Sequence, residues 1–287
     1  MDARRTVDLL FARAGERRGL TVPRIVAAAV GIADADGLDA LSMRRLAERL
    51  GFTTMALYRH VPGRAELVEL MRDAAFAGLP AWERQEPRED WRAGLEAWAV
   101  AHWELHLRHP WLAATDGSRR LPGPHVLADY DHALGCAERT GLPPAQAAAV
   151  VDLLAGFVLS AARRVHDVLQ AERASGVSHT RWWHGQDRLV GHMASYPAIA
   201  RLGVSGAFDA PEDPFDFGLA RTLDGVAALV AATSRDGNAA SFRNADDSAD
   251  GGCAVCGAPV PAAPRGRPRR YCSPACRQRA YRGRSGA

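Results

Sequence analysis

The stretch SMRRLAERLGFTTMALYRHVPGR, residues 42–64, decides the fold. It predicts two short helices joined by a tight turn. Ser42 suits the N-cap of the first helix, because its hydroxyl can accept a hydrogen bond from a free amide of the first turn. Gly51 can adopt the positive φ that a sharp helix exit requires. Either Thr53 or Thr54 can cap the second helix.

Three residues in this stretch have the spacing of a helix-turn-helix. Ala47 lets the helices approach, Gly51 makes the turn, and Leu57 packs the second helix onto the first. The whole stretch contains five Arg and one Glu, and the face left outside carries Arg together with hydroxyl, Tyr and His groups. These groups suit phosphates and base edges. An ordinary helical hairpin with a solvated basic face is the alternative, but turn, apolar stripe and basic face all agree on the first interpretation.

The motif resembles the DNA-binding domain of the tetracycline-repressor (TetR) family over about residues 21–70. The resemblance lies in Leu57-Tyr58-Arg59-His60-Val61 after the segment LSMRRLAERLG at 41–51. It implies an all-α homodimer that binds a palindromic operator in double-stranded DNA and releases it when a small-molecule effector binds. The helix after Arg64 would link the two domains.

The resemblance and the chemistry of the outer face together give a set of candidate DNA-binding residues. Arg44 would reach a base edge or a phosphate, Thr54 and Met55 would face bases, and the others would hold phosphates. The roles of Arg44, Tyr58, His60 and Arg64 follow the family motif. The full set is Arg44, Thr53, Thr54, Met55, Tyr58, His60 and Arg64.

Length and composition indicate two domains with an ordinary core. The chain has 287 residues, 47% hydrophobic and 24% charged, which is typical of a globular protein. No apolar run predicts a membrane span, and the first twenty residues are too charged for a secretory signal. We therefore expect a cytoplasmic protein without a membrane partner. The net charge is only +3, so a nucleic-acid surface must be local.

Composition shifts divide the chain into five segments. We expect an N-terminal arm at 1–20, a three-helix DNA-binding domain at 21–80, a helical ligand-binding and dimerisation domain at 88–235, a flexible linker at 236–252 and a tail at 253–287. The arm either reaches the minor groove or is a frayed terminus. Helices of the second domain are expected near 88–108, 111–117, 124–140, 144–173, 187–200 and 214–234, with a mobile loop at 172–186.

Two helices of the second domain are candidates for a dimer interface. The segment 145–163 is apolar nearly all round, and 214–234 has a broad apolar face. The resemblance implies that both pack against their symmetry mates as a four-helix interface; a monomeric core is the alternative. An apolar or aromatic effector would bind among Trp98, His102, Trp103, Phe157 and Trp182. His102 and His106 have a metal-ligand spacing, but no third ligand is evident.

The C-terminal tail contains two cysteine pairs, Cys253-x-x-Cys256 and Cys272-x-x-x-Cys276. Cytoplasmic proteins seldom keep disulfides, and four thiolates suit a closed, structural zinc site. The second half also resembles treble-clef zinc fingers. A redox-active dithiol is the alternative, which would make the tail a zinc or redox sensor. Eight Arg follow between 265 and 287 and indicate either a nucleic-acid contact or a solvated basic tail.

Motifs for catalysis are not evident. The sequence contains neither a glycine-rich phosphate loop nor a Gly-x-Ser-x-Gly nucleophile motif. We therefore expect a DNA-binding regulator and not an enzyme.

Overall fold

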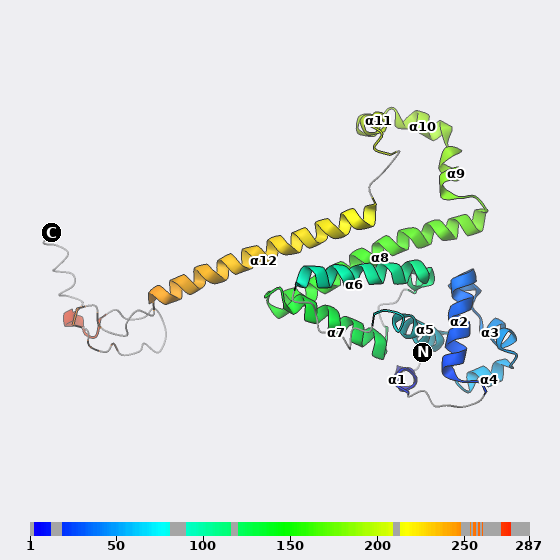
Figure 1. Ribbon diagram of the computed structural model, residues 1–287, viewed down its shortest axis with the longest axis horizontal. Coiled ribbons are helices and arrows are strands. Elements are labelled where there is room, and N and C mark those ends of the chain that lie inside the picture. The colour runs from blue at the N-terminus through cyan, green and yellow to red at the C-terminus, as the bar shows by residue number, and fades with distance from the viewer. Residues whose placement is uncertain are drawn as a thin grey trace. The chain divides into compact units, whose positions relative to one another are not determined.

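The computed structural model describes residues 3–12, 19–80, 90–115, 120–208, 213–247, 253, 255–256, 258, 260 and 271–276, and in these residues all of the regular secondary structure is helical. Contacts divide the chain into two units, Met1–Val230 and Ala231–Ala287. The first unit contains both the helix-turn-helix and the larger helical domain (Figure 1). The all-α prediction is confirmed for the described residues.

The N-terminal half of the first unit is a small helical domain. Its elements are α1 (Ala3–Leu10), α2 (Val22–Asp36), the 3-10 turn η1 (Leu38–Ala40), α3 (Met43–Leu50), α4 (Thr54–Tyr58) and α5 (Arg64–Phe76). Thr21 caps α2 by accepting a hydrogen bond from the Arg24 amide, and Pro lies in the first turn, where a missing amide costs little. The side chains that fill its centre are apolar, among them Ile25, Ile32, Leu46, Leu57 and Leu67.

The C-terminal half of the first unit is built around three helices that pack on one another. These are α6 (Trp91–Arg108), α7 (Pro124–Glu138) and α8 (Pro144–Ser175), with the 3-10 turn η3 (Pro110–Ala114) after α6. The short helices α9 (His179–His184), α10 (Asp187–Met193) and α11 (Pro197–Val204) follow, and α12 (Pro214–Asp247) ends the described helices. Leu95, Val151, Leu154, Leu219 and Leu223 belong to its apolar core.

Helix α8 is long and apolar enough to cross a membrane, judged by length and composition alone, and the core helix of a globular domain passes the same test. One face of α8 packs into the core described above through Val150, Val151, Leu154 and Val158. The other face is not buried, since Leu153 is 55% exposed. The face of α8 that carries Leu153 is therefore not covered within one subunit.

Several predicted boundaries differ from the structure. The helix expected at 187–200 is two helices, because the residue before Pro197 is disfavoured in helical conformation. The loop expected at 172–186 contains the end of α8 and all of α9. The linker expected at 236–252 is helical through Asp247. No Pro interrupts the sequence there, and extending an existing helix costs little.

The N-terminal arm also differs from both alternatives considered for it. Residues 3–10 form α1, which packs against α5 with Thr6 and Leu10 buried. The arm is therefore a part of the small domain over this range. Residues 13–18, which would test the remainder of the arm, lie outside the described residues.

Candidate nucleic-acid interface, effector pocket and cysteine cluster

The turn between α3 and α4 is built as the sequence predicts. The Ser42 hydroxyl accepts a hydrogen bond from the Arg45 amide at 3.1 Å, and Gly51 adopts a left-handed conformation with φ of 74°. The Thr53 hydroxyl accepts from the Ala56 amide at 3.3 Å, so Thr53 and not Thr54 is the cap of α4. Leu57 is completely buried, which holds α4 against the core.

The opposite face of α4 is exposed. Met55 is 65% and Tyr58 43% exposed, and Thr53 and Thr54 also face solvent, whereas His60 is half-buried. Four of the seven candidate residues therefore lie on one accessible face around the start of α4 and along it.

Two of the candidate arginines have partners within the chain. Arg44 pairs with Glu48 at 3.0 Å, and both side chains are mostly exposed, at 86% and 63%. Such a pair is worth less than about 1 kcal/mol and exchanges readily for a phosphate. Arg64 instead donates from Nε to the Leu41 carbonyl at 3.1 Å and from Nη2 to the Leu38 carbonyl at 2.9 Å. Arg64 therefore ties the start of α5 to the η1 region.

The predicted effector pocket divides into separate groups. Trp98 and His102 on α6 are buried, and both bond to Asp129 of α7. Trp98 Nε1 donates to Asp129 Oδ1 at 3.1 Å, and His102 Nε2 lies 2.8 Å from Oδ2. This cluster spans the α6–α7 contact, and its carboxylate was not among the predicted residues.

Trp103 and Phe157 form a second group through a residue that the prediction missed. Phe215 of α12 stacks on Trp103 at 4.5 Å between centroids and on Phe157 at 5.7 Å. A Cβ on Gly218 would lie 2.5 Å from the Phe157 ring, so only glycine permits this approach. Trp182 is not brought to either group: it packs edge-on against Trp183 at 5.1 Å, and both rings remain nearly half exposed.

His106 is the most unusual polar group in this half of the unit. Its Nδ1 is buried and has no hydrogen-bond partner among the residues that the structure describes. Burial, followed by the charges of His102 and Arg120, lowers the pKa of His106 to about 4. A buried polar atom without a partner costs free energy, so Nδ1 of His106 destabilises this part of the fold.

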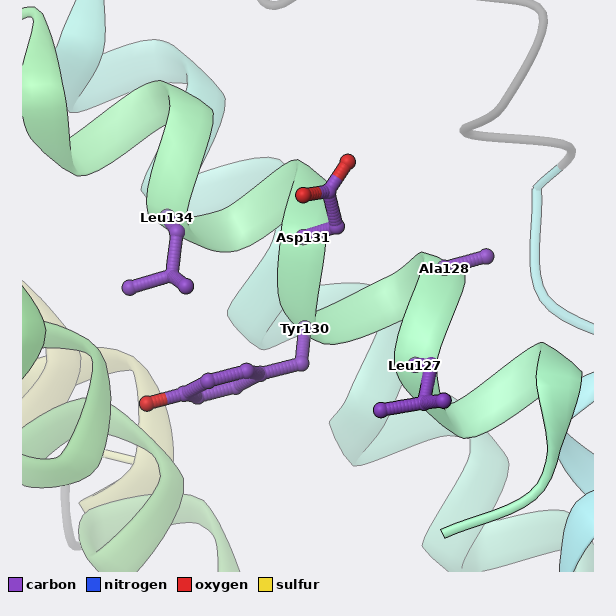
Figure 2. A pocket seen from close by; sticks show the side chains of 5 residues that line it. All are labelled: Leu127, Ala128, Tyr130, Asp131 and Leu134. Carbon is purple, nitrogen blue, oxygen red and sulfur yellow. The ribbon is translucent and has the colours of Figure 1, made fainter.

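A depression of about 410 Å³ lies elsewhere, on the outer side of α7. Leu127, Ala128, Tyr130, Asp131 and Leu134 line it. Figure 2 shows that all five side chains come from this one helix. None of the predicted pocket residues lines it. An open hollow on a single helix cannot enclose a small molecule in the manner of a ligand pocket.

Polar contacts join the small N-terminal domain to the larger one. The Asp34 carboxylate of α2 accepts from Trp111 Nε1 at 2.7 Å and lies 2.8 Å from His109 Nδ1. The buried Asp73 carboxylate of α5 accepts from the amides of His125 and Val126 at 3.0 and 3.1 Å. Asp73 thus caps α7, a helix of the other domain.

The junction also depends on a glycine. A Cβ on Gly123 would lie 2.3 Å from the Asp73 carboxyl carbon, so this N-cap position admits only glycine without displacing the carboxylate. Close to it, Phe76 of α5 contacts His102 edge-on at 5.4 Å between centroids. The small N-terminal domain therefore directly contacts His102, which belongs to the cluster with Trp98 and Asp129.

Comparison with known proteins assigns both domains. A family model described as bacterial regulatory proteins, tetR family, matches residues 25–71, and one described as the tetracyclin repressor-like C-terminal domain matches residues 84–230. The chain belongs to the TetR family. It is therefore a DNA-binding transcriptional regulator, and the function class expected from the sequence is confirmed.

Individual TetR-family relatives support the same assignment. The HTH-type transcriptional repressor DrrR1 of Streptomyces coeruleorubidus is 37% identical over 80% of this chain and 87% of that protein. Apo ActR from Streptomyces coelicolor has a TM-score of 0.62 at 28% identity, covering 76% of this chain and 100% of its own. ActR in complex with actinorhodin gives a TM-score of 0.61 at 27% identity, covering 76% and 98%.

The cysteine cluster lies beyond both TetR family matches. The sulfurs of Cys253, Cys256, Cys272 and Cys276 all lie within 4.8 Å of one another. The Cys253 amide donates to the Ala258 carbonyl at 2.8 Å, and the Ser273 hydroxyl accepts from the Cys276 amide at 3.3 Å. The structure therefore brings the four predicted ligands together, in a set that could bind a metal ion.

The spacing of the sulfurs permits a test of the metal. The pairs 256–272, 256–276 and 272–276 are separated by 3.5, 3.6 and 3.7 Å. A tetrahedral zinc with sulfur ligands at about 2.3 Å places its sulfurs about 3.8 Å apart. The donor set and its geometry therefore fit zinc.

Proposed function

We propose that the protein is a homodimeric repressor that binds a palindromic operator through α3 and α4 and is released from it by a small aromatic molecule. The observation that carries the proposal is the exposed polar face of α4, which two caps, Gly51 and the buried Leu57 hold in place. The proposed repressor would act in the cytoplasm, where the chromosomal DNA lies. Binding and releasing DNA requires no catalytic group.

On the operator, the residues would divide between bases and backbone. Thr54 and Met55, at the exposed start of α4, would face base edges, with Met55 in contact with a thymine methyl. Tyr58 and His60 would donate to phosphates, and Thr53 could donate its hydroxyl proton while its oxygen caps the helix. Arg44 would exchange Glu48 for DNA.

Arg64 has a different role in this proposal from the one that the family motif implies. Its guanidinium already donates to two backbone carbonyls, so it would orient the start of α5 relative to η1. A phosphate would be held there by the free amides at the N-terminus of α5, whose cap Gly63 offers no side chain.

The dimer would form through the outer faces of α8 and α12. Leu153 of α8 and Phe217 and Leu229 of α12 are 55%, 52% and 41% exposed. Large apolar side chains on two long neighbouring helices are typical of a subunit interface. Trp182 and Trp183 of α9 have no apolar cover in the subunit core described here, and we propose that they pack on the partner.

The effector would be planar and aromatic, with a polar group that meets His106. The stacked rings of Trp103, Phe157 and Phe215 provide the aromatic wall. The unpartnered Nδ1 of His106 provides the polar anchor. The complex of ActR with actinorhodin, a relative of known structure, supports an effector of this class.

The release of DNA would pass through the junction between the domains. His106 lies one helical turn before His109, which contacts Asp34 of α2 together with Trp111. A molecule that displaces this end of α6 would move the Asp34 contact and thereby α2, the helix against which α3 packs. Effector binding and DNA binding can be coupled in this way only if the contacts differ between the DNA-bound and the effector-bound state.

We also propose that the cysteine cluster holds one structural zinc per chain. Four thiolates would fill the coordination sphere and leave no position open for catalysis. No observation favours zinc as the sensed signal over the aromatic effector.

The test uses DNA from the region upstream of the protein's own gene and measures binding by fluorescence anisotropy across a salt series. Tyr58→Phe should weaken binding by a similar factor at every salt concentration, because it removes a phosphate hydrogen bond but no charge, and the salt slope depends on the charges that neutralise phosphates. Tyr196→Phe is the matched control, since Tyr196 is an exposed tyrosine on the other domain. Equal binding by Tyr58→Phe and the parent at every salt concentration would contradict the assignment of α4.

A further inference from the structure

The positive charge of this chain is concentrated at its C-terminal end. Residues 265–287 contain eight Arg and no acidic residue, a charge of +8, while the whole chain carries only +3. Residues 1–264 therefore carry −5. A negatively charged body repels the DNA backbone at long range, so the attraction that brings a regulator to DNA must come from the tail or from local patches.

The tail is an addition to the repressor. Both TetR family models end at or before residue 230, and residues 231–287 form a compact unit of their own. The sequence-reading residues of α3 and α4 belong to the other unit. A role for the tail is therefore separate from recognition of the operator sequence.

The four cysteines give this segment a means of folding. A segment of this size cannot bury enough apolar surface to fold alone, so metal binding would supply its folding free energy. The described contacts are those of a metal knuckle followed by a helix start: the Cys253 amide bonds to Ala258, and Ser273 caps the turn that contains Cys276. The metal would fix Cys272 and Cys276 directly before four of the arginines.

The residue types point to phosphate as the bound group. Every basic side chain in the tail is Arg, whose planar guanidinium binds phosphate oxygens in pairs. Tyr271 and Tyr281 are interspersed with them. Between 265 and 287, Gln278 is the one amide side chain and no carboxylate is present, so nearly all of the polar chemistry of the tail suits phosphate oxygens.

We propose that residues 253–287 form a metal-nucleated module that binds the phosphates of duplex DNA without sequence preference. It would raise the local concentration of the repressor on DNA and leave the choice of operator to α3 and α4. Because the dimer has two tails, it would carry sixteen positive charges in this role, as the eight arginines of one chain imply.

The experiment compares the full-length zinc-loaded dimer with a variant in which Arg277, Arg279, Arg282 and Arg284 are changed to Gln. The matched control changes four exposed arginines of the other unit, Arg164, Arg181, Arg188 and Arg201, to Gln. Binding to a random-sequence duplex is measured by fluorescence anisotropy between 50 and 200 mM KCl. The tail variant should lower the slope of log K against log salt by up to about seven units, since the dimer loses eight arginines at about 0.9 per phosphate contact; the control should leave it unchanged.

Two further variants separate charge from fold. Cys272→Ser with Cys276→Ser keeps every arginine but removes metal, and it should bind random duplex more weakly than the parent while still carrying the same charge. A chain that ends after Asp247 should lose the whole contribution of the tail to random-duplex affinity. It should still prefer the operator to random duplex. Equal random-duplex affinity of the parent and the arginine variant overturns the proposal. If the unmodified parent binds the operator no more tightly than random duplex, that result counts against the repressor function and not against the role of the tail.

Discussion

The helix-turn-helix and the larger helical domain differ in the polar side chains that they bury. Helices α2 to α4 bury only apolar residues, with Ile25, Leu46 and Leu57 fully enclosed. Helices α6 and α7 also bury His102 and Asp129, together with most of His106. Apolar burial stabilises, whereas buried polar groups cost free energy unless each is satisfied. The core under the helix-turn-helix is therefore apolar, whereas the α6–α7 contact also depends on buried polar groups.

Removal of a buried apolar side chain from the helix-turn-helix should have the largest effect on the free energy of unfolding. Leu57→Ala should lower the free energy of unfolding by about 3 kcal/mol, because it leaves a cavity where α4 packs on the core. Operator binding should fall with it. Urea denaturation followed by circular dichroism measures the change. Leu107→Ala, at an exposed leucine of α6, is the control and should stay within about 0.5 kcal/mol of the parent.

A fall in pH tests the contribution of the buried polar groups of the larger domain to stability. The pKa of His106 is lowered from 6.5 to about 4 by burial, so the unfolded chain binds a proton there before the folded chain does. Stability from this group is therefore complete above pH 6.5 and is lost as the pH falls from 6.5 to 4. The loss should reach about 3 kcal/mol at most.

Chemical denaturation at several pH values in this range measures the loss. His106→Gln should flatten the dependence, whereas His192→Gln, at an exposed histidine of α10, should not. A smaller slope should remain in His106→Gln, because burial also lowers the pKa of His132. A parent whose stability is constant from pH 6.5 to 4 would show that His106 is not held neutral by the fold.

The smallest expected change in stability is at an exposed ion pair on the helix-turn-helix. Glu48→Gln removes an exposed partner of Arg44, so the free energy of unfolding should change by less than about 0.5 kcal/mol. Operator affinity should nevertheless rise, because a negative charge leaves the DNA-facing surface and Arg44 is freed. Glu138→Gln, at an exposed position of α7, serves as the control. Equal operator affinity of Glu48→Gln and the parent would place Arg44 away from DNA.

Local rules explain why the helix-turn-helix could be predicted from sequence. Its caps, turn and apolar stripe lie within residues 42–64. The structure selects Thr53 from the two predicted caps of α4 and differs in giving Arg64 carbonyl partners. Those carbonyls belong to Leu38 and Leu41, more than twenty residues earlier. Sequence spacing gives no sign of such a contact.

The effector region was less predictable because its contacts are all between distant helices. Trp103 and Phe157 were chosen as aromatic residues, but Phe215, which joins them, comes from α12. Asp129 lies on a helix whose polar residues gave no reason to expect a buried carboxylate. The cysteine cluster was predictable since ligand spacing along the chain reflects the coordination geometry of the metal. The extension of α12 was missed because small polar residues are typical of linkers as well as of exposed helices.

The cap that α7 borrows from Asp73 has a consequence for how the protein folds. Gly123 gives α7 no side-chain cap of its own, and the amides of His125 and Val126 are satisfied by a carboxylate from α5. Neither domain is then complete alone: separation would leave Asp73 without its donors and α7 with free amides at its start. The two domains of this unit should therefore unfold in one cooperative transition, and a reading domain expressed by itself should melt earlier than it does within the full chain.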